Sequence, residues 1–432
     1  MIKEETPVIL IINFHSTKNA GDLALLQSVI NQMKNAFGSP RIFVSANYPD
    51  EQGFTNLDVE VIPSIWSLSG INKRKVVIWQ IIKVILNSLI IFVSTKEKKN
   101  GNILPKNGLK RLLAAYQIAD LVVGTSGNQF YSTGKFGWPF PVNILSVALC
   151  HKFKKPLYVM PQSIGPLRRW WEKILLRLVY RGARKVYLRD KLSLSVAKDL
   201  GIPENILEYS PDPAFSFQAA PENIAKCTLE KYHVLEGLPA LGLTVISPMG
   251  HSLEYDQVNN YYSILIEVLK RFLETYSAQV VIFNQVVGPS VFEDDSIAAL
   301  TIHKELRIYS EKVILIDEPL HPTILKACYG LMDAFIASRL HSGIFSLGMY
   351  VPTLFIGYLS KTKAILDSIG LEDDCLEISK LTYDTFLEQI IMLWENQEDR
   401  TNTLRRIMPI IITESKKPQE WISMDYFNVK RI

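Results

Sequence analysis

The chain has 432 residues, 48% of them hydrophobic, which is enough apolar side chain for two or three domains of roughly 100–200 residues each. Its 47 basic and 43 acidic residues give a formal charge of +4, too balanced for a protein that binds nucleic acid through bulk charge. The four cysteines form no C-x-x-C pair and the seven histidines show no close ligand spacing, so we expect neither a disulfide framework nor a metal.

The N-terminal half begins with a short acidic segment and then the apolar run VILIINF at 8–14. This start lacks the basic residues and cleavage site of a signal peptide, so we expect a cytoplasmic protein. Similar β-branched runs alternate with segments of helical periodicity, at 41–46, 59–62, 120–125, 156–161 and 184–190. Such runs are typical of parallel strands that are buried on both faces and joined by helices.

One segment, 76–94, approaches the about 20 apolar residues that span a bilayer. It carries a narrow polar stripe, and a spanning helix would leave Lys83 near the hydrocarbon midplane at a cost of about 3 kcal/mol or more. We therefore expect a helix packed within the first domain, and keep peripheral contact with the inner face of the cell membrane as the alternative. The stretch 168–181, with Trp170 and Trp171, favours that alternative, although an amphipathic surface helix is the simpler interpretation.

After a polar stretch near 218–237 the alternation of apolar runs and helical segments starts again. The apolar runs of this second half lie at 241–247, 278–285, 312–317, 333–338 and 352–357. The sequence therefore predicts two α/β domains in tandem, an N-terminal domain over 1–220 and a C-terminal domain over 221–400. A helical tail is predicted over 401–432.

The stretch SRLHSG predicts a strand that ends near Ser338 and a helix that begins near Leu340. In open parallel sheets, ligands bind beyond the carboxyl ends of the strands. His341 would lie in the first helical turn, where backbone N–H groups and the helix dipole favour an anion. Arg339 adds a fork of donors suited to phosphate or carboxylate, and an imidazole beside an anion can act as a general acid.

A structural interpretation of the same residues is open as well. Arg339 could pair with a local carboxylate such as Asp333 or Asp317, while His341 caps the helix. For an isolated R-x-H this interpretation is the better one, and the rest of the chain decides between the two.

Several further motifs, in order and spacing, resemble those of the polysaccharide pyruvyl transferase family over roughly residues 10–372. They are NAGDLALLQSVINQM from Asn19, PQSIGPL from Pro161, VYLRDKLSLSVAKDLGI from Val186, PDPAF from Pro211, and SRLHSG followed by VPTLFIGYLSK from Ser338. Each motif is weak alone, and the order makes the resemblance specific. One departure is GTSGNQF from Gly124, where the family often has a run of three glycines.

The resemblance implies two Rossmann-like domains that face a central cleft, as in the GT-B glycosyltransferases. The domain over 1–220 would be the acceptor side and the domain over 221–400 the donor side. It also implies an enzyme that uses phosphoenolpyruvate as co-substrate, with no other cofactor, and places a pyruvate ketal on a sugar with release of phosphate. The acceptor would be a sugar or lipid-linked oligosaccharide in polysaccharide or exopolysaccharide biosynthesis.

The resemblance carries over to individual residues. His341 and Arg339 would be catalytic, and the donor would be bound by Arg189, Arg339, Leu340, His341 and Lys361. We expect the acceptor to be bound by Asn19, Asp22, Asn128 and Gln162. An equal alternative for Lys361 is a solvated lysine at the start of a helix. Asp22 could simply be a carboxylate that interacts with the dipole at the start of its helix. Asp212 is expected to order the hinge between the domains or to orient Arg189.

Two rival functions belong to other classes. The nearest is a nucleotide-sugar-dependent GT-B glycosyltransferase, but the sequence after Gly237 lacks the pair of glutamates, eight positions apart, that many retaining members carry. The other is a silent scaffold or sugar-binding module, which the joint presence of Arg189, Arg339 and His341 argues against.

Overall fold

The computed structural model describes residues 6–69, 107–132, 139–247, 255–358 and 360–430. Contacts divide the chain into two compact units. The first contains 1–17, 25–212 and 416–432, and the second contains 18–24 and 213–415. The segment 76–94 lies outside the described residues, so its packing within the first domain and the alternative of membrane contact both stay predictions. Within the described ranges, no helix has the length and apolarity that crossing a bilayer requires.

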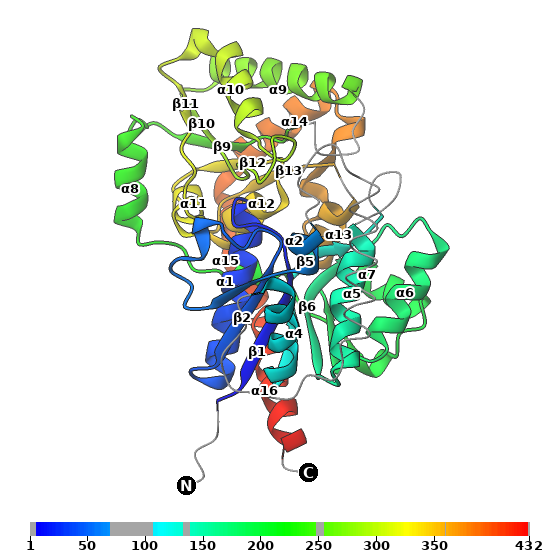
Figure 1. The fold of residues 1–432 in the computed structure, drawn as a ribbon. Helices are drawn as coiled ribbons and strands as arrows, with labels where there is room; N and C mark the ends of the chain where they lie inside the picture. Colours follow the sequence, from blue (N-terminus) through cyan, green and yellow to red (C-terminus); the bar gives the residue numbers. More distant parts are fainter. Residues whose placement is uncertain (1–5, 70–106, 133–138, 248–254, 359, 431–432) are drawn as a thin grey trace. The chain divides into compact units, whose positions relative to one another are not determined.

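The first unit contains an eight-stranded sheet, counted over the described residues, in which every recorded strand pair is parallel (Figure 1). Its strands are β1 (Val8–Phe14), β2 (Arg41–Ala46), β3 (Glu60–Pro63), β4 (Leu121–Gly124), β5 (Gly127–Phe130), β6 (Leu157–Ile164), β7 (Lys185–Leu188) and β8 (Leu207–Tyr209). The order is β3-β2-β1-β4-β6-β7-β8, and β5 pairs with β6. The strand order therefore changes direction between β1 and β4.

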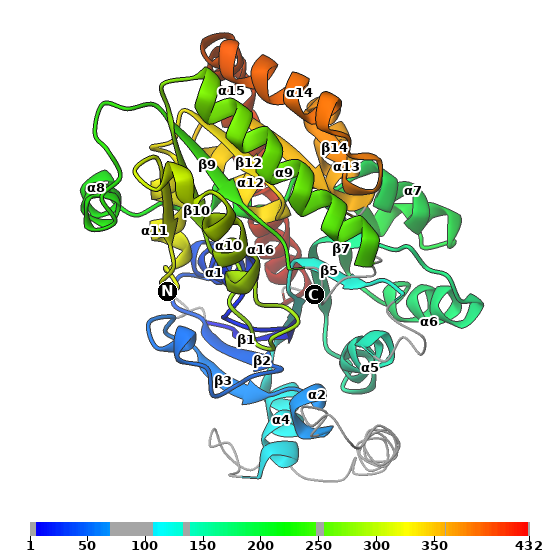
Figure 2. The ribbon, with the colours of Figure 1, turned by 90° about the horizontal axis from the view of Figure 1, so that it is seen from above.

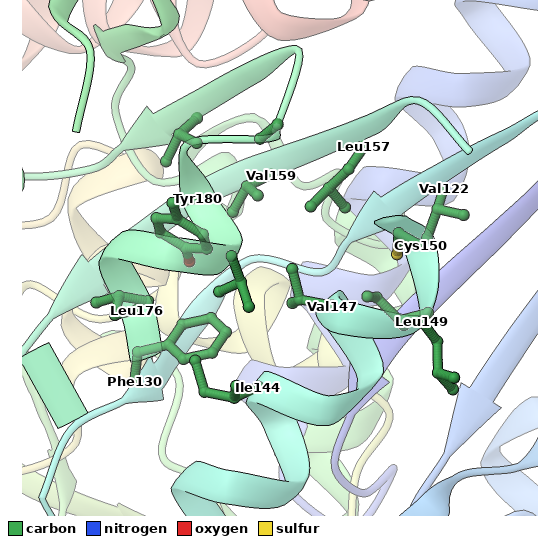
Figure 3. Packing of buried hydrophobic residues seen from close by; sticks show 14 of the residues in the cluster. Val122, Phe130, Ile144, Val147, Leu149, Cys150, Leu157, Val159, Leu176 and Tyr180 are labelled. Atoms are coloured by element: carbon green, nitrogen blue, oxygen red, sulfur yellow. The ribbon is translucent and has the colours of Figure 1, made fainter. Parts of the chain in front are cut away.

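The helices of the first unit connect its strands, apart from the C-terminal α16. They are α1 (Ala20–Phe37), whose first turn belongs to the second unit, α2 (Ile65–Ser69), α4 (Gly108–Ile118), α5 (Pro139–Lys152), α6 (Trp170–Tyr180), α7 (Lys191–Asp199) and the C-terminal α16 (Lys417–Lys430). Figure 3 shows how α6 contributes to the core, with Leu176 and Tyr180 pointing toward Phe130. The rings of Phe130 and Tyr180 meet edge to face, with their centroids 5.4 Å apart. The inner side of α6 is thus fixed by packing.

The second unit contains a six-stranded parallel sheet, again counted over the described residues. Its strands are β9 (Ala240–Thr244), β10 (Gln279–Phe283), β11 (Val313–Ile316), β12 (Ala334–Ala337), β13 (Thr353–Gly357) and β14 (Cys375–Glu377). Its helices are α8 (Glu222–Lys231), α9 (Tyr255–Thr275), α10 (Ser296–Glu305), α11 (Pro322–Tyr329), α12 (Leu340–Gly348), α13 (Ser360–Ser368), α14 (Tyr383–Glu395) and α15 (Gln397–Glu414). The order β11-β10-β9-β12-β13-β14 is that of a Rossmann fold, with its switch point between β9 and β12.

The prediction of two parallel α/β halves is confirmed. The described residues of the tail predicted over 401–432 form the end of α15, which belongs to the second unit, and α16, which belongs to the first. The chain passes from the first unit to the second after Asp212, eight residues before the predicted boundary at 220.

Candidate active site

The N-terminus of α12 lies at the switch point of the second sheet. Arg339 takes the N-cap position with an extended backbone, and the helix begins at Leu340. The Ser342 hydroxyl donates to the Arg339 carbonyl at 2.7 Å and lies 2.6 Å from the Thr244 hydroxyl at the end of β9. A Cβ on Gly343 would lie 2.0 Å from the Phe355 ring, so only glycine allows α12 this close to β13. These contacts fix the first turn beside β9.

The Arg339 guanidinium is held by a buried carboxylate. Its Nε donates to Asp295 Oδ2 at 2.7 Å and its Nη2 to Asp295 Oδ1 at 2.6 Å. The side chain of Arg339 is 11% exposed and that of Asp295 is 1% exposed. Asp295 also accepts the Ser247 N–H at 2.7 Å. The bidentate pair sets the plane of the guanidinium and leaves a small part of it accessible.

The carboxylates named as alternative partners of Arg339 are engaged elsewhere. Asp333 accepts the Ala240 N–H at 2.7 Å, and Asp317 accepts the Tyr232 hydroxyl at 3.1 Å. The structural interpretation therefore named the right kind of partner but the wrong residues.

Tyr358, which follows β13, is a second partner of Arg339 through a side-chain hydrogen bond. Burial alone would lower the pKa of Arg339, but Asp295 and Tyr358 outweigh it, so the pKa lies above its ordinary value. Burial raises the pKa of the Tyr358 hydroxyl, although Arg339 opposes the shift. The guanidinium thus stays charged and the phenol stays neutral.

His341 is half-buried and lies against the first turn of α1. A Cβ on Gly21 would lie 2.2 Å from His341 Nδ1 and 2.8 Å from His341 Cβ. The absence of a side chain at Gly21 is therefore a condition for the observed place of the imidazole. The structure thus explains this glycine: it allows the close approach of α1 to the imidazole.

Asn19 and Asp22 stand at the start of α1. Asn19 Oδ1 accepts the N–H groups of Gly21 at 3.0 Å and Asp22 at 3.3 Å, so it caps the helix. The prediction placed both residues in the N-terminal domain, whereas the structure groups 18–24 with the second unit. The reason is backbone pairing: Ala20 N–H donates to the Gln285 carbonyl at 3.1 Å, beside the bridge between Asn19 and Val286.

The structure thus brings Asn19, Asp22, Arg339, Leu340 and His341 together in the second unit, with α1 and α12 meeting at their first turns. Lys361 lies in the first turn of α13 and is half-buried. Among the described residues, no group of three or more His, Cys, Asp and Glu side chains is arranged to hold a metal ion.

Replacing Gly21 by alanine should lower activity because the new methyl group must displace the imidazole of His341. We expect turnover to fall by about tenfold to a hundredfold, as is usual when a reacting group is misplaced by about 1 Å. The control is Gly38→Ala, directly after α1 in the first unit, whose new Cβ meets open space. This change adds backbone strain at a φ of +78° and should still keep wild-type activity. Equal activity in Gly21→Ala and wild type, measured by steady-state kinetics, would show that the close contact has no role.

Arg189 lies in the first unit and is 1% exposed. Its Nη1 donates to Asp212 Oδ2 at 2.5 Å and its Nε to the Ser163 hydroxyl at 2.8 Å. Asp212 is itself fully buried. The pairing agrees with the role of orienting Arg189 that the sequence suggested for Asp212, and direct contact of Arg189 with a donor would require this pair to open.

Asn128 and Gln162 belong to a polar cluster of the first unit, near the carboxyl ends of β4 and β6. Gln162 is fully buried, and its Nε2 donates to the Thr125 carbonyl. Gln129 Nε2 donates to the Asn13 carbonyl at 2.9 Å. Among the described residues, four buried oxygens of this cluster have no hydrogen-bond partner: Thr125 Oγ1, Asn128 Oδ1, Gln129 Oε1 and Gln162 Oε1. Buried polar atoms in native proteins are nearly always satisfied, so these oxygens suit a polar ligand or water.

Comparison with family models identifies the family of the chain. Residues 19–360 match the model of the family described as polysaccharide pyruvyl transferase. The chain belongs to the polysaccharide pyruvyl transferase family. It is therefore a transferase of polysaccharide biosynthesis, and the matched range contains Asn19, Arg189 and the whole of α12.

A curated relative of this pyruvyl transferase family member is the amylovoran biosynthesis protein AmsJ from Erwinia amylovora. The two are 20% identical over 397 residues, which cover 90% of this chain and 93% of AmsJ.

Solved structures with a similar fold include a UDP-GlcNAc 2-epimerase from Neisseria meningitidis and a glycosyltransferase from Rickettsia africae. The epimerase is 11% identical with a TM-score of 0.58, covering 97% of this chain and 99% of that one. The glycosyltransferase is 13% identical with a TM-score of 0.56, covering 98% and 99%. This likeness concerns the fold alone, and it confirms the predicted GT-B-like class of two Rossmann-like domains.

The PDPAF motif of this pyruvyl transferase family member is held by a buried lysine. Lys326 Nζ donates to the carbonyls of Phe217 at 2.7 Å, Phe215 at 3.1 Å and Ala214 at 3.4 Å. Burial lowers the pKa of Lys326 to about 7. Lys326 therefore fixes the chain directly after it enters the second unit.

Lys326 should make stability rise with pH above neutrality. Because the folded pKa of about 7 lies below the ordinary 10.5, the unfolded chain binds more protons between these values. The free energy of unfolding should then rise by up to about 1.4 kcal/mol per pH unit from this group. Urea unfolding at pH 7, 8 and 9 should show a smaller rise for Lys326→Met than for wild type, and parallel pH dependences would contradict the assignment.

Sequence reasoning missed several residues of the two clusters, chiefly Asp295, Tyr358, Thr125 and Gln129. Tyr358 stands in the quoted stretch VPTLFIGYLSK, and Thr125 and Gln129 stand in GTSGNQF, so position after a strand was an available signal for these three. Asp295 precedes α10 within an acidic stretch, and no local pattern distinguishes it from Asp294.

Proposed function

We propose that the protein transfers pyruvate from phosphoenolpyruvate to two hydroxyls of a sugar in a polysaccharide or its precursor. The product is a pyruvate ketal, and phosphate is released. The observation that supports this most is a charged guanidinium and an imidazole at the N-terminus of α12, inside the range that matches the family.

Phosphoenolpyruvate carries a carboxylate and a phosphate, so its site needs oriented positive potential. The first-turn N–H groups of α12 and the positive end of its dipole supply one part. Arg339 supplies the other part of the positive potential. Its hydrogen bonds to Asp295 and Tyr358 fix the orientation of the guanidinium plane. Lys361 and Arg189 are proposed donor residues too, Arg189 through the opening of its pair with Asp212.

His341 is the proposed general acid. Protonated imidazole gives its proton to the methylene carbon, which becomes the methyl group, and positive charge develops at the neighbouring carbon. A sugar hydroxyl attacks that carbon and loses its proton, which restores the imidazolium. The bond to the phosphate oxygen breaks, a second hydroxyl closes the ketal, and its proton leaves with phosphate.

The polar cluster around Gln162 is the proposed acceptor site of the first unit. Sugar hydroxyls donate and accept, so four buried oxygens without partners among the described residues suit them. Asn19 and Asp22 remain proposed acceptor residues at the start of α1, where Asn19 is already engaged as a cap.

Thr125→Val should separate acceptor binding from folding. The Thr125 hydroxyl has no partner among the described residues, so its loss should leave the melting temperature unchanged or slightly higher. If the hydroxyl accepts from the sugar, the acceptor KM should rise by about tenfold while the phosphoenolpyruvate KM stays constant. Thr125→Ser keeps the hydroxyl and should behave as wild type. An unchanged acceptor KM in Thr125→Val would remove this residue from the site.

The function itself is tested by incubating purified protein with phosphoenolpyruvate and a panel of free and lipid-linked glycans. Phosphate release that requires one glycan, with a mass gain corresponding to the ketal, supports the proposal. Release of nucleotide from a sugar nucleotide under the same conditions would instead support the glycosyltransferase alternative. Cytoplasmic location and peripheral contact through 76–94 are further proposals, which fractionation of cells would test.

A further inference from the structure

Helix α6 of the first unit exposes a row of large apolar side chains. Trp170 is 74% exposed, Ile174 is 48% exposed and Leu178 is 60% exposed. Their spacing of four residues places them along one side of the helix. Apolar rows of this kind on a protein surface mark contact sites more often than isolated apolar residues do.

A basic row runs beside the apolar one. Lys173, Arg177 and Arg181 follow the same spacing of four and are all exposed, as is Arg168 before the helix. Between 167 and 181 the sequence has a single carboxylate, Glu172, and it is fully buried and paired with Arg169 at 2.6 Å. The exposed face of α6 therefore carries positive charge only.

The opposite side of the helix is committed to the core. Leu176 and Tyr180 are fully buried there, and Figure 3 shows both packed among residues of the first sheet. In Figure 1 and Figure 2, α6 lies at the outer edge of the first unit beside α5. The exposed row is thus held on a rigid helix and has no role in the packing of its own unit.

We propose that this α6 face, defined by Trp170, Ile174, Leu178 and the flanking basic residues, docks onto an anionic phospholipid surface. Tryptophan and aliphatic side chains suit the headgroup boundary, and arginine and lysine pair with lipid phosphates. A second copy of the same face is a poorer partner because its basic row would oppose an identical basic row. The inference does not depend on the proposed reaction.

Sedimentation with vesicles tests the proposal. Wild-type protein should bind phosphatidylglycerol–phosphatidylcholine vesicles and should bind phosphatidylcholine vesicles far less. Trp170→Ser/Ile174→Ser/Leu178→Ser should weaken binding to the anionic vesicles by at least about tenfold, and so should Lys173→Gln/Arg177→Gln/Arg181→Gln. Ile308→Ser/Ile410→Ser/Met424→Ser is the matched control, because these side chains are 80%, 64% and 65% exposed and lie on other helices.

Two results would overturn the proposal. Equal vesicle binding by wild type and the α6 variants would show that another segment makes any membrane contact. Absence of binding by wild type, together with a dimer in light scattering that the Trp170 triple variant loses, would assign the face to self-association. Phosphate release with a soluble acceptor should stay at the wild-type rate in both α6 variants, which separates failure of docking from failure of the proposed reaction.

Discussion

Replacing His341 by alanine should lower the rate of phosphate release from phosphoenolpyruvate by about 10²–10⁴-fold, the usual contribution of a positioned general acid. The donor KM should change little, because Arg339 and the N–H groups of α12 stay in place. His341 is half-buried beside Gly21, so its removal leaves space at the surface and should not unfold the chain.

The control for this variant is His303→Ala, another half-buried histidine of the second unit, at the end of α10. It should keep wild-type kinetics. Reaction in heavy water should place one deuterium in the methyl group of the ketal with wild-type protein. A loss of less than about threefold in His341→Ala would assign the proton transfer to another group.

Replacing Arg339 by alanine should affect both folding and donor binding. Asp295, which is 1% exposed in the intact pair, would lose its guanidinium partner, and breaking a buried pair in this way costs about 3–5 kcal/mol in the free energy of unfolding. The phosphoenolpyruvate KM should rise in the same variant because the charged fork is lost.

The double variant Arg339→Ala/Asp295→Ala separates the two effects. It removes the isolated carboxylate, so urea unfolding should show that a large part of the lost stability returns. The donor KM should stay as high as in Arg339→Ala. Recovery of the donor KM together with stability would mean that Arg339 serves folding alone.

Three features could be predicted from the sequence: the alternation of strands and helices, the ends of the strands, and the position of His341 in a first helical turn. All three depend on residues that are close together in the chain. The three-residue strands β8 and β14 were missed because they are short and partly exposed, so they lack a buried apolar run. Local pattern is a weak guide to edge strands of this length.

The partners within the site could not be predicted, since they come from distant parts of the chain. Asp295 lies 44 residues before Arg339, and their pairing depends on how α10 and α12 pack on the sheet. The contact between Gly21 and His341 likewise depends on the backbone pairing of the start of α1 with the segment at Gln285 and Val286. Motif order indicated that these residues matter, and only the fold shows what each one touches.

The division of the chain also limits how the protein can be dissected. The polypeptide changes unit after Thr17, after Ala24, after Asp212 and after Ser415. A fragment that ended at Asp212 would lack α16, and one that began at Pro213 would lack the glycine against which His341 rests. Neither half can be recovered whole by a single cut, so separating the two fragments after proteolysis near Asp212 should remove part of the structure of each half.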